Sequence, residues 1–142
     1  MYENILLPLD INARESQTKA CQTAVKLAES FGARLHVLCV VPDFGMSVVG
    51  SFFPEGFEQK MLSEAEAQLD AFVAKSFPAE LVAQRIVGHG SIYQVILETA
   101  KSSGADLIIM ASHRPELEDY LLGPNAARVT RHARCSVLVV RD

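Results

Sequence analysis

The first candidate for chemistry is Asp10, a carboxylate that directly follows the apolar residues 5–9. An apolar run without alternation is typical of a strand that is buried on both faces. A carboxylate just beyond such a strand can accept a hydrogen bond from a ribose hydroxyl or hold a magnesium ion. The alternative is that Asp10 only caps the turn or helix that follows. The spacing leaves both interpretations open.

A second candidate is the segment 122–127, which reads Leu-Gly-Pro-Asn-Ala-Ala and is predicted to open a helix. The first N–H groups of a helix have no partner within it and lie at the positive end of its dipole, so they bind phosphate. Gly123 would permit close approach and Asn125 could donate through its amide, whereas Pro124 removes one N–H donor. The alternative is an ordinary helix start with a glycine cap.

Weaker signals follow two other predicted strands. Residues 88–91 read Gly-His-Gly-Ser, where glycine would let the backbone approach a ligand and Ser91 could equally be a helix cap. Residues 112–114 read Ser-His-Arg. The planar guanidinium of Arg114 can pair with phosphate, and a protonated His113 can do the same. Such residues in a loop are usually only solvated. They are candidates here only because they directly follow a predicted strand.

No complete catalytic motif is present. The sequence contains neither the Walker A pattern nor the dinucleotide pattern Gly-x-Gly-x-x-Gly. Its four histidines have no metal-type spacing, and no base, nucleophile and orienting group occur as a set. Catalytic residues are therefore not assigned, and whether the protein is an enzyme stays open.

The elements that must position these residues alternate along the chain. Apolar runs predict strands at 5–9, 35–41, 82–87, 106–111 and 136–140, and helical periodicity predicts helices at 15–31, 58–76, 91–103 and 124–134. This order predicts an α/β fold with a single open parallel five-stranded sheet and helices on both faces. We expect one domain over residues 1–142. Ligands of such sheets bind beyond the carboxyl ends of the strands, where the winding direction reverses.

Composition and charge argue against several classes of protein. The net charge of -4 argues against a nucleic-acid binder. We expect no signal peptide, because the N-terminus has neither a basic region nor a small-residue cleavage site. We expect no membrane insertion, because no apolar run is long enough to span a bilayer. Three cysteines without metal-type spacing indicate reduced thiols and a cytoplasmic protein. The loop 43–57 is unusually apolar, which is typical of a lid or of a surface for an unknown regulatory protein partner.

Over essentially its whole length the chain resembles the universal stress protein family. Residues 2–10 are similar to the family's opening strand with its Pro-x-Asp, and the similarity continues through 105–113, 121–129 and 131–140. The stretches Ala-Ser-His-Arg-Pro and Leu-Leu-Gly-Pro-Asn-Ala resemble the enterobacterial F and G branch. The resemblance implies a Rossmann-like fold of the adenine nucleotide alpha hydrolase type, with strand order 3-2-1-4-5. It also implies a homodimer through the last strand (136–140) and a stress-linked regulatory role in the cytoplasm.

The resemblance further implies an ATP, ADP or AMP site, with or without Mg²⁺ held by Asp10 through the nucleotide. Adenine and ribose would meet Pro8, Leu9, Asp10 and the backbone of Val40. The sugar would be bordered by Gly88, Met110 and Ala111. The phosphates would meet residues that follow the predicted strand 106–111 and residues at the start of the predicted helix 124–134. These are Ser112, His113, Arg114, Gly123, Pro124, Asn125 and Ala126.

This chain departs from the glycine pattern of the nucleotide-binding branch, Gly-x2-Gly-x9-Gly-(Ser/Thr). Ala111 stands at the first glycine and Arg114 or Pro115 at the second, so only Gly123 survives, and Pro124 replaces the hydroxyl residue. His113 and Arg114 would then be local replacements for the missing donors. Three hypotheses follow: a regulatory dimer that binds adenine nucleotide, a dimeric interaction module of the same fold that needs no nucleotide, and a slow ATP hydrolase.

Overall fold

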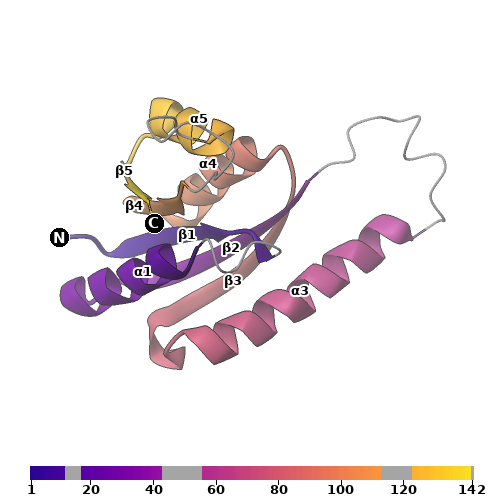
Figure 1. Cartoon of the computed structure of the whole chain (residues 1–142), viewed down its shortest axis with the longest axis horizontal. Coiled ribbons are helices and arrows are strands. Elements are labelled where there is room, and N and C mark those ends of the chain that lie inside the picture. Colours follow the sequence, from indigo (N-terminus) through magenta and orange to yellow (C-terminus); the bar gives the residue numbers. More distant parts are fainter. Residues whose placement is uncertain (12–16, 43–55, 113–122, 142) are drawn as a thin grey trace.

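A computed structural model describes residues 1–11, 17–42, 56–112 and 123–141. Five parallel strands form one sheet in the order β3-β2-β1-β4-β5, which confirms the fold class and the strand order expected from the resemblance (Figure 1). The strands are β1 (Asn4–Leu9), β2 (Arg34–Pro42), β3 (Val82–Gly90), β4 (Leu107–Ala111) and β5 (Ser136–Val140).

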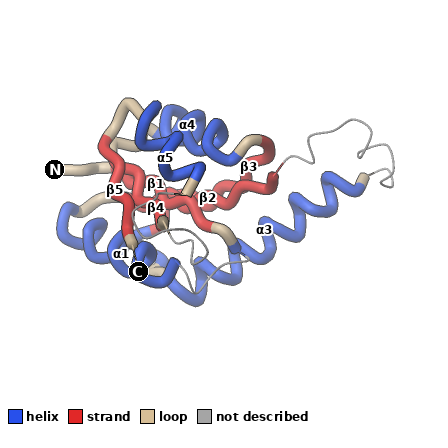
Figure 2. Tube along the Cα trace, turned by 45° about the horizontal axis from the view of Figure 1, so that its top comes forward, coloured by secondary structure: helices blue, strands red, loops and turns tan. Residues whose placement is uncertain are grey.

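Helices cover both faces of this sheet. Figures 1 and 2 show α1 (Thr18–Phe31) and α3 (Phe57–Ser76) on one face, and α4 (Ile92–Ser103) and α5 (Pro124–His132) on the other. A short 3-10 helix, Ala79–Leu81, leads from α3 into β3. Among the described helices, none is both long and apolar enough to cross a membrane.

The core lies in two layers, because successive side chains of each strand point to opposite faces. Along β1, Ile5 and Leu7 belong to the layer under α1 and α3, and Leu6 belongs to the layer under α4 and α5. All three side chains are fully buried. Burial on both faces is the physical reason why residues 5–9 lack the polar alternation of a half-exposed strand.

Several element ends differ from the predicted ones by one to three residues. Strand β3 runs through Gly90, because His89 and Gly90 still pair with Val41 and Pro42 of β2, whereas the glycines predicted an end at 87. Helix α4 begins at Ile92, and Ser91 precedes it without a side-chain cap hydrogen bond. Helix α5 ends at His132 rather than at 134.

Strand β4 begins at Leu107 rather than at 106, and the side chain of Asp106 just before it has a separate role. Its two carboxylate oxygens accept the backbone N–H groups of Glu3 and Asn4 at 2.9 and 3.0 Å. The carboxylate therefore anchors the start of β1, the strand that carries Asp10 at its other end, to the start of β4.

Candidate functional site

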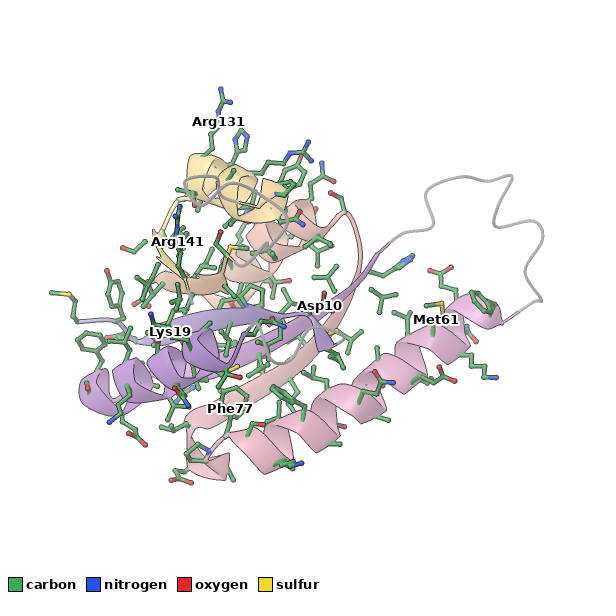
Figure 3. The ribbon with its side chains drawn as sticks, viewed as in Figure 1. Asp10, Lys19, Met61, Phe77, Arg131 and Arg141 are labelled. Carbon is green, nitrogen blue, oxygen red and sulfur yellow. The ribbon has the colours of Figure 1, made fainter. Side chains whose placement is uncertain are left out.

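The candidate site lies at the carboxyl edge of the sheet, between β1 and β4. From β1 the chain adds β2 and β3 on one side, and it then returns to place β4 and β5 on the other side. In open parallel sheets ligands bind beyond the carboxyl ends of the strands at such a reversal, which here falls between β1 and β4. Asp10 follows the last residue of β1, and Ser112 follows the last residue of β4. Figure 3 shows Asp10 at this end of β1.

Asp10 has an exposed side chain, and its backbone is hydrogen-bonded to the side chain of Gln17. Its N–H donates to Oε1 of Gln17 at 2.7 Å, and its carbonyl oxygen accepts from Nε2 of the same side chain at 2.6 Å. Gln17 itself is buried. The carboxylate of Asp10 is thus presented at the edge of the sheet, while its main chain is fixed by one buried amide.

Gln17 is the residue that the sequence reasoning missed. It occupies the cap position of α1 but makes no side-chain cap hydrogen bond there, because its amide is bound to Asp10. Ser, Thr, Asp and Asn are the usual caps. The predicted helix began at residue 15 and so placed Gln17 inside it, where glutamine is an ordinary residue. In the structure α1 begins at Thr18, and no local signal pointed to the contact with Asp10.

The turn after β1 also contacts the end of β2. Leu9 pairs with Cys39 in the parallel ladder. Burial raises the pKa of the Cys39 thiol, a hydrogen bond with the backbone of Ile11 opposes that rise, and the negative charge of Asp10 adds to it. The Asp10–Ile11 turn therefore lies against Cys39 on the β2 side.

The second half of the site is the start of α5. Gly123 is its cap residue, Pro124 its first residue, and no side chain makes a cap hydrogen bond among the described residues. The N–H of Gly123 donates to Oγ of Ser112 at 3.4 Å, and the N–H of Ser112 donates to the carbonyl of Val140 at 2.9 Å. Ser112 therefore joins the ends of β4 and β5 to the helix start, next to the N–H groups of Asn125 and Ala126.

Gly88 has a packing reason to be glycine. A Cβ at this position would lie 2.4 Å from Cγ1 of Val95 on α4, so the space of the absent side chain is already filled. Its neighbour His89 contacts Glu58 of α3, with 3.0 Å between Nδ1 and Oε1. The structure thus supplies a packing role for Gly88, whereas Ser91 makes no side-chain cap hydrogen bond. Approach of Gly88 to a ligand stays a prediction.

The remaining predicted site residues differ in what they can offer. The side chains of Leu9, Met110 and Ala126 belong to the core, so only their backbone is available to a ligand. Pro8, Val40, Ala111 and Asn125 are half-buried at or near this edge. His113 and Arg114, like most of the apolar loop 43–57, lie outside the described residues.

The side chains of α5 and β5 carry net positive charge. Residues 123–141 contain four arginines and no aspartate or glutamate. Arg128 lies over the ring of Tyr93, 5.1 Å from its centroid, and Arg131 points away from the fold into solvent (Figure 3). In the described part of the chain no three His, Cys, Asp or Glu side chains gather as a metal site.

An open parallel sheet of order 3-2-1-4-5 with helices on both faces defines a Rossmann-like α/β domain. Its candidate site has a carboxylate beyond the first strand and the start of α5 beyond the fourth. The family model described as universal stress protein family matches residues 1–141. The chain belongs to this family.

Its relatives cover nearly the whole chain. Universal stress protein G of Escherichia coli O157:H7 is 34% identical over 143 residues, which is 99% of this chain and 100% of the relative. The structure of universal stress protein UspA from Lactobacillus plantarum is 27% identical, covers 99% of this chain and 98% of its own, and superposes with a TM-score of 0.72. A universal stress protein in complex with cAMP shares the fold, at 22% identity and a TM-score of 0.63, with 98% and 97% of the two chains covered.

Proposed function

We propose that this universal stress protein is a cytoplasmic stress-response regulator that binds an adenine nucleotide at the carboxyl edge of its sheet. The observation that carries the proposal is the pairing of two features on either side of the switch point. The exposed carboxylate of Asp10 follows β1, and β4 is followed by the start of α5, which no described side chain caps. One suits a ribose hydroxyl, and the other suits phosphate.

In this proposal Asp10 accepts hydrogen bonds from the ribose, and the backbone at Val40 meets the adenine. The N–H groups of Asn125 and Ala126, the Asn125 amide and the Ser112 hydroxyl bind the phosphates. A magnesium ion fits this donor set, because Mg²⁺ is commonly held by one or two carboxylates together with the phosphates of its nucleotide. Asp10 would be its protein ligand, and the ion would neutralise phosphate charge.

Three supports for the proposal come from outside the site itself. Family membership brings the expectation of nucleotide binding, and a universal stress protein of the same fold forms a complex with cAMP. Residues 123–141 contain no aspartate or glutamate, so α5 and β5 themselves add no negative side-chain charge. We therefore include cAMP with ATP, ADP and AMP among the nucleotides to be tested.

We also propose that residues 1–142 act as one domain and that two copies pair through β5. Among the described strands, β5 is at the edge of the sheet and pairs with β4 alone. Its residues Val137–Val140 are all half-buried apolar side chains. An apolar strand edge of this kind is normally covered by another chain or element.

A second candidate function is a dimeric interaction module that needs no nucleotide. The specific observations in its favour are that Pro124 offers no N–H at the first position of α5 and that Val95 already fills the space beside Gly88. In this alternative a regulatory protein partner would replace the nucleotide.

Calorimetric titration of nucleotide-stripped protein with ATP, ADP, AMP and cAMP, with and without magnesium, tests the proposal. Saturable micromolar binding of one of these ligands supports it. Absence of saturation up to millimolar concentrations would contradict it and favour the interaction module. Phosphate release measured on the same samples, against heat-inactivated protein, tests the slow-hydrolase alternative.

A further inference from the structure

The cap residue of α1 has an unusual role in this chain. A cap side chain normally accepts an N–H from the first turn of its own helix. Gln17 does not, and its amide instead makes two hydrogen bonds to the backbone of Asp10, seven residues earlier in the chain. We call these two hydrogen bonds the Gln17 clamp.

The clamp fixes more than one peptide bond. The N–H of Asp10 belongs to the peptide group before its α-carbon, and the carbonyl belongs to the peptide group after it. Each peptide group is planar, so tying both of them restricts the two backbone dihedrals of Asp10. Those dihedrals set the direction of the Cα–Cβ bond. The clamp therefore fixes the direction in which the Asp10 side chain leaves the backbone.

The surroundings make the clamp effective. Gln17 is 6% exposed, so water competes weakly for its two hydrogen bonds, and breaking them is costly in a buried setting. The same turn also contacts Cys39 of β2 through Ile11. Asp10 is thus held between the start of α1 and the end of β2, on elements of the scaffold.

We infer that Gln17 is the positioning residue of the nucleotide site, the residue that holds Asp10 for recognition of the ribose. This inference rests on the proposed function. Gln17 does not itself touch the nucleotide in this arrangement. Its contribution is to remove the backbone freedom that Asp10 would otherwise lose on binding, which is how preorganisation increases affinity.

The test compares Gln17→Met with Gln22→Met. Methionine matches the length of glutamine but cannot form the clamp. Gln22 is an exposed residue of the same helix, so its substitution controls for the chemical change and for helix stability. Asp10→Asn and the double variant with Gln17→Met complete a thermodynamic cycle.

The first readout needs no nucleotide. Amide hydrogen exchange at Asp10 should be at least about tenfold faster in Gln17→Met than in the native protein or in Gln22→Met, because the N–H loses its acceptor. Unchanged exchange at Asp10 overturns the inference, whatever the protein binds.

The second readout is the preference for ATP over 2′,3′-dideoxy-ATP. The native protein should prefer ATP by about tenfold to a hundredfold, the range expected for hydrogen bonds to a carboxylate. Gln17→Met should lose most of this preference, as Asp10→Asn does, and the double variant should lose no more. If Gln17→Met keeps the preference, the positioning role is overturned and the proposed function stands. If the native protein binds neither ligand, both are overturned.

Discussion

The α-carbon of Gly88 lies against the side chain of Val95, so that even one methyl group on this carbon would come within 2.4 Å of Cγ1 of Val95. Contacts this short are forbidden to real Cβ atoms. Strand β3 and helix α4 are therefore packed through a glycine. The same glycine was a candidate for ligand approach in the sequence, and the two roles lead to different expectations for its variants.

Gly88→Ala should destabilise the fold by about 1–3 kcal/mol, the usual cost of forcing a methyl group into filled space. Chemical denaturation of the native and variant proteins measures this change. Val95→Ala in the same chain should recover part of it, because the clashing methyl group is removed. A Gly88→Ala protein as stable as the native one would contradict the packing account.

Asp106→Asn should lower the free energy of unfolding by about 1–2 kcal/mol, because two charge-assisted hydrogen bonds to the N–H groups of Glu3 and Asn4 are weakened. Asp70→Asn is the matched control. Its carboxylate is exposed and lies 3.9 Å from Arg85, so we expect less than about 0.5 kcal/mol. Equal effects of the two substitutions would show that Asp106 is not the anchor of β1.

Pro124→Ser should strengthen ATP binding. Serine supplies the N–H that proline lacks at the first position of α5, and its hydroxyl restores the residue type that the family pattern has there. One added hydrogen bond to a charged phosphate is worth about tenfold or more in affinity. The gain should be much smaller for adenosine, which has no phosphate. Calorimetry with both ligands checks this, and an equal gain for both would argue against phosphate at this helix start.

The buried thiol of Cys21 should make the fold less stable at high pH. Burial raises its pKa to about 11. The native state therefore keeps its proton after the unfolded chain has lost it, and stability falls as the pH rises from about 9 to 11. The free energy of unfolding should therefore fall less steeply with pH in Cys21→Ala than in the native protein. The two slopes should differ by up to about 1.4 kcal/mol per pH unit. Parallel curves for the two proteins would contradict this pKa.

Much of the fold follows from local pattern. Residues 5–9 are apolar without alternation because both faces of β1 are covered, and this is visible in the sequence. Gly32 and Gly104 follow α1 and α4 in the left-handed conformation, which is why glycine marks those helix ends. The order of the strands came from the resemblance, since local patterns do not state which strands are neighbours.

The site was less visible in the sequence. Asp10 and the start of α5 were predicted from their positions after apolar runs. Gln17 was missed because its role depends on a contact with a turn seven residues away, which no local propensity encodes. Gly88 illustrates the opposite case, because a glycine in a sequence does not reveal whether a ligand or Val95 occupies the space beside it.

The most direct test of the central claim is the affinity for ATP of Asp10→Ala compared with Asp70→Ala, measured by calorimetry on nucleotide-stripped protein with magnesium. Both substitutions remove one exposed carboxylate, but only Asp10 lies at the switch point. The account predicts that Asp10→Ala weakens binding at least about tenfold while Asp70→Ala binds like the native protein. Equal affinity of Asp10→Ala and the native protein would contradict a nucleotide site at this edge of the sheet.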